Sequence, residues 1–185
     1  MRLTEKYKKE VVPKMMERFG YKNPMEVPKI EKVVVNAGFG RFVVGKPGSE
    51  REKIQEHILK TLTLITGQKA VLTKARKSIS GFKLRKGMPI GAKVTLRRKR
   101  MYDFLEKLIL LVLPRTRDFR GIPLNAFDKN GNLTLGFKEY TPFPEVVPEK
   151  EKGIFGLEVT VVTTAKNREK GIELLRLLGF PIKKE

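Results

Sequence analysis

Seven cationic side chains lie close together between residues 74 and 93: Lys74, Arg76, Lys77, Lys83, Arg85, Lys86 and Lys93. Guanidinium and ammonium groups pair with phosphate oxygens, and the hydroxyls of Ser78 and Ser80 can add hydrogen bonds that fix register. Phe82 stands among these cations, where an aromatic ring can stack on a base or a sugar. This combination indicates contact with a polyanion, although a basic surface loop without any ligand has the same composition.

The net charge of +20 is concentrated in one part of the chain. Residues 57–102 contain 13 Lys and Arg and no Asp or Glu, whereas residues 103–185 contain 14 basic and 12 acidic residues. Soluble domains usually intersperse both signs, which limits self-repulsion. The acid-free stretch therefore predicts a surface that binds a polyanion. Nucleic acid is the usual candidate, and an anionic membrane surface is the alternative.

A nucleotide hydrolase is the enzymatic rival. Residues Gly40–Lys46 match most of the phosphate-binding loop pattern, and they lie between a predicted strand and a predicted helix. The next residue is Pro47, where that pattern requires a Ser or Thr to hold magnesium. His57 is the only histidine and there is no cysteine, so neither a metal site nor a catalytic residue is predicted. The sequence thus favours a protein that is not an enzyme and needs no cofactor.

The composition also predicts the compartment of the protein and whether it enters a membrane. The absence of cysteine suits a reducing compartment, and the charged first ten residues do not form a signal peptide. The longest apolar run, Leu108–Leu113, is too short to span a bilayer. The acid-free stretch is interrupted by predicted strands and glycines, so it does not form an amphipathic basic helix for a membrane surface. We expect a soluble, cytoplasmic protein without a membrane partner.

Periodicity predicts four helices. The first spans residues 3–19, with a kink or break at Pro13. The second opens with a capping box formed by Ser49 and Glu52 and ends at Gly67. The third spans residues 101–113 and is stopped by Pro114. The last follows an Asn167 cap and ends at Gly179.

Five strands are predicted at residues 30–37, 69–74, 93–98, 133–137 and 157–164, where β-branched and apolar residues gather. Residues 75–92 are expected to be a long loop or an extended hairpin tip. Strands and helices do not alternate strictly along the chain. The order therefore favours an α+β fold in a single domain over residues 1–185, with a mixed or antiparallel sheet and helices on one face.

Residues 77–91, KSISGFKLRKGMPIG, closely resemble the signature of the family of large-subunit ribosomal protein five in its bacterial form. Four other segments resemble the family in the same order: residues 32–38, 64–69, 114–121 and 178–181. The resemblance covers essentially the whole chain. It implies a curved, mostly antiparallel sheet with helices on its convex side, a long basic loop, and a place in the cytoplasmic ribosome.

The resemblance also implies partners and contact residues. The concave face of the sheet would bind 5S rRNA in the central protuberance, beside large-subunit rRNA and neighbouring 5S-binding proteins. Its contact residues would be Asn36, Gln68 and Thr95, with Lys32, Lys69, Lys93 and Arg97 nearby. The basic loop would reach the P-site tRNA through Lys74, Arg76, Lys77, Ser80, Phe82, Lys83, Arg85 and Lys86. A bridge to small-subunit ribosomal protein thirteen would use Arg115, Arg117, Arg120 and Asn130.

Overall fold

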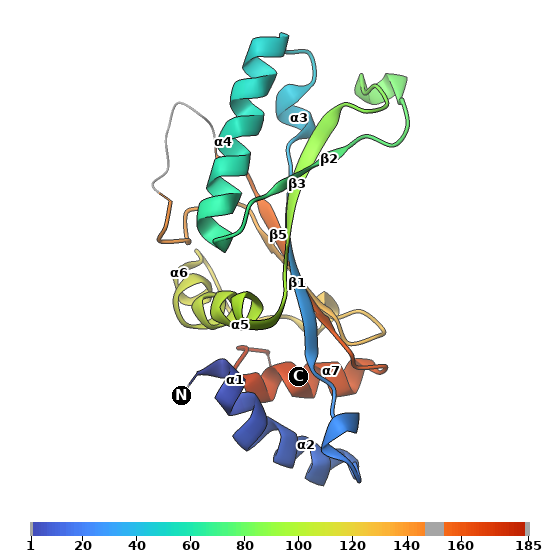
Figure 1. The fold of residues 1–185 in the computed structure, drawn as a ribbon, viewed down its shortest axis with the longest axis vertical. Helices are drawn as coiled ribbons and strands as arrows, with labels where there is room; N and C mark the ends of the chain where they lie inside the picture. The colour runs from blue at the N-terminus through green and yellow to red at the C-terminus, as the bar shows by residue number, and fades with distance from the viewer. Residues whose placement is uncertain (1, 147–153, 184–185) are drawn as a thin grey trace. The chain divides into compact units, whose positions relative to one another are not determined.

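The chain forms one antiparallel sheet with the strand order β2-β3-β1-β5-β4 (Figure 1). The strands are β1 Ile30–Gly38, β2 Val71–Lys74, β3 Pro89–Leu96, β4 Leu133–Phe137 and β5 Leu157–Thr163. The computed structural model describes residues 2–146 and 154–183. Together with the helices below, this sheet confirms the predicted α+β fold.

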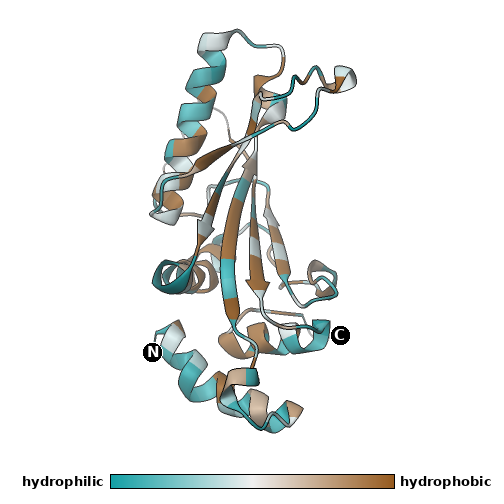
Figure 2. Cartoon of the chain, turned by 45° about the vertical axis from the view of Figure 1, so that its right-hand side comes forward, coloured by the Kyte–Doolittle hydropathy of each residue, from teal (hydrophilic) through white to brown (hydrophobic). Residues whose placement is uncertain are grey.

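The longer helices come in four groups: α1 Leu3–Lys6, the π-helical η1 Tyr7–Val11 and α2 Val12–Phe19; α4 Gly48–Thr66; α5 Arg98–Lys107, the π-helical η4 Leu108–Val112 and α6 Leu113–Arg115; and α7 Arg168–Leu178. Shorter helical turns are η2 Pro24–Glu26, α3 Gly40–Val43, η3 Ser80–Phe82 and η5 Leu124–Ala126. The strands are mainly hydrophobic, whereas much of α2 and α4 is hydrophilic (Figure 2).

The structure divides into two compact units. Unit 1 comprises residues 1–33, 97–135 and 160–185, and unit 2 comprises residues 34–96 and 136–159. Strands β1, β4 and β5 each continue from one unit into the other. The organisation as a single domain stays a prediction, and each unit is described by itself below.

In unit 2, α4 packs against β3. Helix α4 supplies Ile58, Leu62 and Ile65 to this core, and all three are at most 2% exposed. Tyr140 and Phe143 are fully buried although their segment has no sequence periodicity. The His57 ring packs against Tyr140 and Phe155, with centroid distances of 6.5 and 6.2 Å, which agrees with a structural role.

In unit 1, two helices accommodate a proline in the same way. Pro13 and Pro114 each lie two residues after a π-helical turn, η1 and η4 respectively. A proline ring clashes with the carbonyl four residues earlier, and a π turn widens the backbone at that point. The prediction that Pro114 stops its helix is therefore wrong, because the helix continues through α6 to Arg115. The break predicted at Pro13 takes the form of this π turn.

Helix ends test the capping rules. Asn167 caps α7 by accepting a hydrogen bond from the Glu169 N–H at 3.2 Å, and Gly179 ends it at φ 108°, as predicted. The capping box of Ser49 and Glu52 is wrong, because α4 begins at Gly48 after Pro47 and no side chain caps it. Ser49 already lies within the first turn, so its hydroxyl is past the capping position.

Between β1 and α4 the chain forms a short helix, α3, whose Val43 is buried. Strand β3 begins at Pro89 rather than at residue 93, which shortens the predicted loop. Pairing with β2 explains the earlier start, since Thr73 lies opposite Gly91 and Lys74 opposite Pro89. Pro89 is tolerated there because it is the first residue of its strand, next to a shift in register.

Candidate nucleic-acid interface

In unit 2, polar and apolar residues separate to opposite sides of β1 and β3. Val94 and Leu96 are buried, whereas Lys93 is exposed and Thr95 is half-buried. Asn36 is half-buried between the buried Val35 and Ala37. Successive side chains of a strand point to opposite faces, so Asn36, Lys93 and Thr95 lie on the side away from the core. These three predicted contact residues are thereby accessible.

Gln68, a further predicted contact residue, lies beside Thr95. The Gln68 Nε2 donates a hydrogen bond to the Thr95 carbonyl oxygen at 3.0 Å. Gly67, at φ 66°, ends α4 and turns the chain toward β2, and the exposed Lys69 follows. The helix end thus brings the polar side chain of Gln68 to β3.

Lys32 and Arg97 belong to unit 1, where they share one acidic partner. Glu31 Oε1 lies 3.4 Å from Arg97 Nη1 and 3.7 Å from Lys32 Nζ. Sequence reasoning placed both cations among the RNA contacts but assigned nothing to Glu31. The position of Glu31 directly before Lys32 was the feature of the sequence that could have drawn attention to this carboxylate.

The predicted basic loop is a folded hairpin tip between β2 and β3. The Ala75 N–H donates to the Met88 carbonyl at 2.8 Å, and the Gly87 N–H donates to the Ala75 carbonyl at 2.9 Å. Further out, Ile79 and Leu84 exchange two hydrogen bonds of 3.0 and 3.1 Å, which closes a tight turn through η3. Lys83 adopts φ 51° in that turn. Backbone hydrogen bonds therefore close the hairpin at its base and at its tip.

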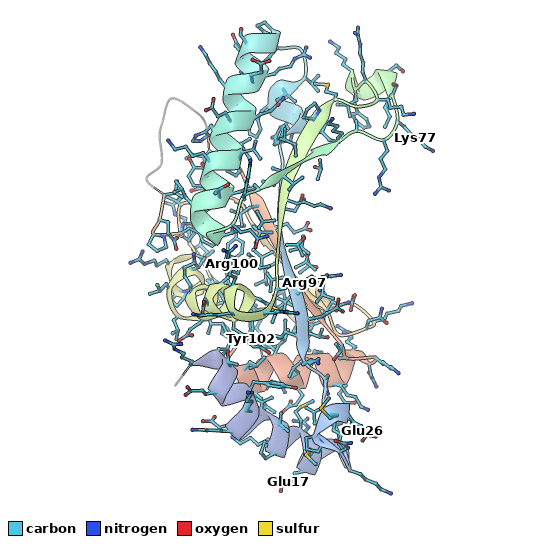
Figure 3. The ribbon with its side chains drawn as sticks, viewed as in Figure 1. Glu17, Glu26, Lys77, Arg97, Arg100 and Tyr102 are labelled. Carbon is cyan, nitrogen blue, oxygen red and sulfur yellow. The ribbon has the colours of Figure 1, made fainter. Side chains whose placement is uncertain are left out.

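The side chains of the hairpin point outward. Its predicted tRNA-contacting residues are all exposed: Lys74, Arg76, Lys77, Ser80, Phe82, Lys83, Arg85 and Lys86. Figure 3 shows Lys77 projecting away from the strands. Phe82 is 68% exposed and Ile79 is 45% exposed, so two apolar side chains accompany the cations. Ile79 was missed by sequence reasoning, which considered only the aromatic residue.

The predicted bridge residues come from two segments of unit 1. Arg115, Arg117 and Arg120 are exposed on the segment that ends and follows α6. Asn130 is exposed in the turn before β4. Within residues 2–146 and 154–183, the structure gives no hydrogen bond or ion pair that joins the three arginines to Asn130.

Asp128 organises the turn that carries Asn130. Its carboxylate accepts hydrogen bonds from the N–H of Asn130 at 2.9 Å, the N–H of Asn132 at 2.8 Å and the Asn132 side chain at 2.7 Å. Burial alone raises the pKa of Asp128, but the hydrogen bonds from Asn132, Asn130 and Gly131 outweigh it, and the pKa is lowered. Hydrogen bonds to the charged form have this effect.

We expect Asp128→Ala to destabilise the protein at neutral pH but much less in acid. The lowered pKa means that Asp128 adds stability above its unfolded pKa of about 4, and that this contribution is lost as the pH falls through the folded pKa. Thermal unfolding of wild type and variant between pH 7 and pH 3 measures this difference. Asp128→Asn, which lacks the charge but keeps an acceptor oxygen, serves as control. A difference in stability that does not depend on pH would contradict this assignment.

The enzymatic rival finds no support in the geometry. Gly40–Val43 form α3, and Phe39 and Val43 are fully buried, so the segment that matches the phosphate-loop pattern is folded partly into the core. Among residues 2–146 and 154–183, no three His, Cys, Asp or Glu side chains gather as metal ligands. No helix in this part of the chain has the length and apolar character needed to cross a membrane.

Comparison with known proteins shows the family. The family described as "Ribosomal protein L5" matches residues 23–85, and the C-terminus of the same ribosomal protein family matches residues 89–182. Large ribosomal subunit protein uL5 of Dictyoglomus turgidum is 58% identical over 182 residues, 98% of each chain. The uL5 protein of Syntrophomonas wolfei is 56% identical over 182 residues, 98% of this chain and 99% of the relative. That of Caldanaerobacter subterraneus is 54% identical over 183 residues, 99% of each. The chain therefore belongs to the uL5 family, whose members are structural constituents of the large ribosomal subunit and not enzymes.

Proposed function

We propose that this ribosomal protein binds 5S rRNA through the polar side of β1 and β3. The contact residues are Asn36, Gln68, Thr95, Lys69 and Lys93 in unit 2, with Lys32 and Arg97 in unit 1. Amide and hydroxyl groups recognise 2′-hydroxyls and base edges, and the cations meet phosphates. Neighbouring 5S-binding proteins and large-subunit rRNA are the surroundings expected for such a complex.

A single observation carries this proposal. The side of β3 that faces away from the core combines an exposed cation, Lys93, with the half-buried Thr95. A hydrogen bond to the Thr95 carbonyl oxygen holds the Gln68 side chain beside this residue. Neither β2 nor β3 contains a carboxylate that would repel a phosphate. A fixed polar group beside an unopposed cation suits RNA, because phosphates supply affinity while the polar group selects register.

We propose two further contacts for the outer parts of the molecule. The hairpin tip between β2 and β3 contacts the P-site tRNA, which is supported by its exposed cations and by the exposed Phe82. The segment with Arg115, Arg117 and Arg120, together with the turn at Asn130, contributes to a bridge with small-subunit ribosomal protein thirteen. The exposure of these four side chains supports their availability for a partner.

Binding of purified protein to 5S rRNA, to a tRNA and to an unrelated RNA duplex across a salt series tests the main proposal. Affinity that rests on charge alone falls steeply with salt for every RNA. We expect a preference for 5S rRNA that persists as salt rises. Equal binding that disappears with salt for all three RNAs would overturn 5S recognition by this face.

We expect Asn36→Ala and Thr95→Ala each to weaken 5S rRNA binding by about 1–3 kcal/mol, because an RNA donor or acceptor is left unpaired. Among residues 2–146 and 154–183 the Asn36 side chain has no hydrogen-bond partner, so its loss costs the fold little. Ser49→Ala is the control, because Ser49 is an exposed hydroxyl residue at the start of α4. Unchanged affinity in both strand variants would show that the wrong face was chosen.

A further inference from the structure

Glu31 places one carboxylate oxygen beside two candidate RNA-binding cations. Its Oε1 lies 3.4 Å from Arg97 Nη1 and 3.7 Å from Lys32 Nζ. All three residues belong to unit 1. Their side chains are 46%, 53% and 32% exposed respectively, so an RNA backbone can reach the whole group.

Stability does not explain this arrangement. Exposed ion pairs contribute little to the free energy of unfolding, and these distances are longer than the roughly 2.7–2.9 Å of a strong charge-assisted hydrogen bond. Glu173 in the same unit is a useful contrast, since its side chain is 8% exposed and lies 2.6 Å from Arg18 Nη1. Glu173 is a structural ion-pair partner, whereas the contacts of Glu31 can be exchanged for contacts with a ligand.

A carboxylate at this place treats the groups of a nucleic-acid backbone differently. It repels a phosphate that approaches Arg97 or Lys32, because the two anions would share the same cations. It accepts a hydrogen bond from a 2′-hydroxyl, which is a donor that RNA carries next to its phosphates and DNA lacks. Only an RNA held in one register can offer that hydroxyl to Glu31 while its phosphates meet the neighbouring cations.

We propose that Glu31 is a specificity-determining residue of the RNA-binding surface, which disfavours a phosphate at Arg97 and Lys32 unless the same backbone also donates a ribose 2′-hydroxyl to its carboxylate. This inference rests on the proposed binding of 5S rRNA. It assigns a role to an acidic residue that weakens general binding of polyanions. A basic protein benefits from such a residue, since its charge alone would attract any nucleic acid.

The test is Glu31→Gln, which removes the charge and keeps an acceptor oxygen. Binding is measured to 5S rRNA, to an unrelated RNA duplex and to a DNA duplex of the same sequence, at one moderate salt concentration. We expect affinity to rise by roughly threefold to fivefold for DNA, as for the removal of a nearby exposed charge, and by less for the RNA duplex. For 5S rRNA we expect a change below about twofold, because the hydrogen bond to the hydroxyl is retained.

Glu26→Gln is the matched control. It makes the same change in net charge in unit 1, on an exposed residue of η2, and Figure 3 shows Glu26 far from Arg97. This control should affect all three nucleic acids equally and weakly. In an Arg97→Gln background, Glu31→Gln should lose most of its effect on DNA, which ties the effect to this cation rather than to net charge.

Three results would overturn the role of Glu31. Equal gains for DNA, RNA duplex and 5S rRNA would reduce its effect to net charge. Weaker 5S binding without any gain elsewhere would make Glu31 only a support that positions Arg97. The wild-type protein in the same experiment tests the proposed function separately. A wild type without preference for 5S rRNA contradicts that function. If the wild type has this preference and Glu31→Gln changes none of the three affinities, only the present inference is contradicted.

Discussion

Replacement of Lys83, Arg85 and Lys86 by glutamate is expected to abolish the tRNA contact of the hairpin while leaving 5S rRNA binding intact. All three side chains are exposed at the tip. They lie beyond the pairing of β2 with β3, which extends only to the Lys74 and Pro89 pair. The hydrogen bonds that fold the tip are made by the backbone and by Ser78, so the substitutions leave them in place.

The expected magnitude follows from phosphate contacts. Each cation that neutralises a phosphate contributes about 0.7 to 0.9 to the slope of log affinity against log salt. Loss of three contacts should therefore lower the slope for tRNA by about two, and like-charge repulsion adds to the loss. The measurements are the dissociation of P-site tRNA from ribosomes assembled with the variant, and 5S rRNA binding of the free protein at high salt.

The control must carry the same change in total charge. Three exposed lysines of unit 1 serve this purpose: Lys8 and Lys9 on η1, and Lys14 on α2. Their replacement by glutamate also changes the net charge by six. If the hairpin variant loses 5S binding and this control does not, the hairpin belongs to the 5S interface. If tRNA dissociates from both variants at the wild-type rate, the hairpin does not contact tRNA.

Local rules were sufficient where a residue acts through its own backbone. Asn167 and Gly179 fix the ends of α7, and β4 spans the predicted residues 133–137. The same rules failed at Pro114, because a π turn lets the helix continue past it. They also failed at Ser49, because the helix begins one residue before it. In both cases the residue type is one that often ends or caps a helix, but the conformation of the neighbouring backbone gives it another role here.

Contacts between residues far apart in the chain could not be predicted from the sequence. In β3 the apolar Val94 and Leu96 alternate with the polar Lys93 and Thr95, a pattern that puts the two polar residues on the same side of the strand. Nothing local indicates that Gln68 donates to the Thr95 carbonyl, 27 residues away, or that Glu31 faces Arg97, 66 residues away. Tyr140 and Phe143 are buried without periodicity because only tertiary packing covers them.

Gly171→Ala is expected to destabilise unit 1 strongly, although alanine is the better helix former. A Cβ at position 171 of α7 would overlap the carbonyl group and Cα of Gly131, and backbone atoms cannot move aside cheaply. Alanine gains about 1 kcal/mol in helix propensity, and overpacking of a rigid contact costs about 1–3 kcal/mol or more. The overlap involves main chain that Thr163 also holds, through a 3.1 Å hydrogen bond from its Oγ1 to the Gly131 carbonyl. We therefore expect the cost to exceed the gain.

Calorimetric unfolding measures the balance, and a net loss of about 2 kcal/mol corresponds to a fall in Tm of about 4–8 °C for a chain of this size. Gly136→Ala is the control, since a Cβ there meets nothing within 4 Å and the backbone needs no positive φ. The contact between α7 and Gly131 also fixes the turn that presents Asn130. Gly171→Ala should therefore impair the proposed bridge to the small subunit, while 5S rRNA binding by Asn36 and Thr95 in unit 2 persists. An unchanged Tm would mean that α7 and the Gly131 turn can separate freely, and the turn would then be too loosely held to position a bridge contact.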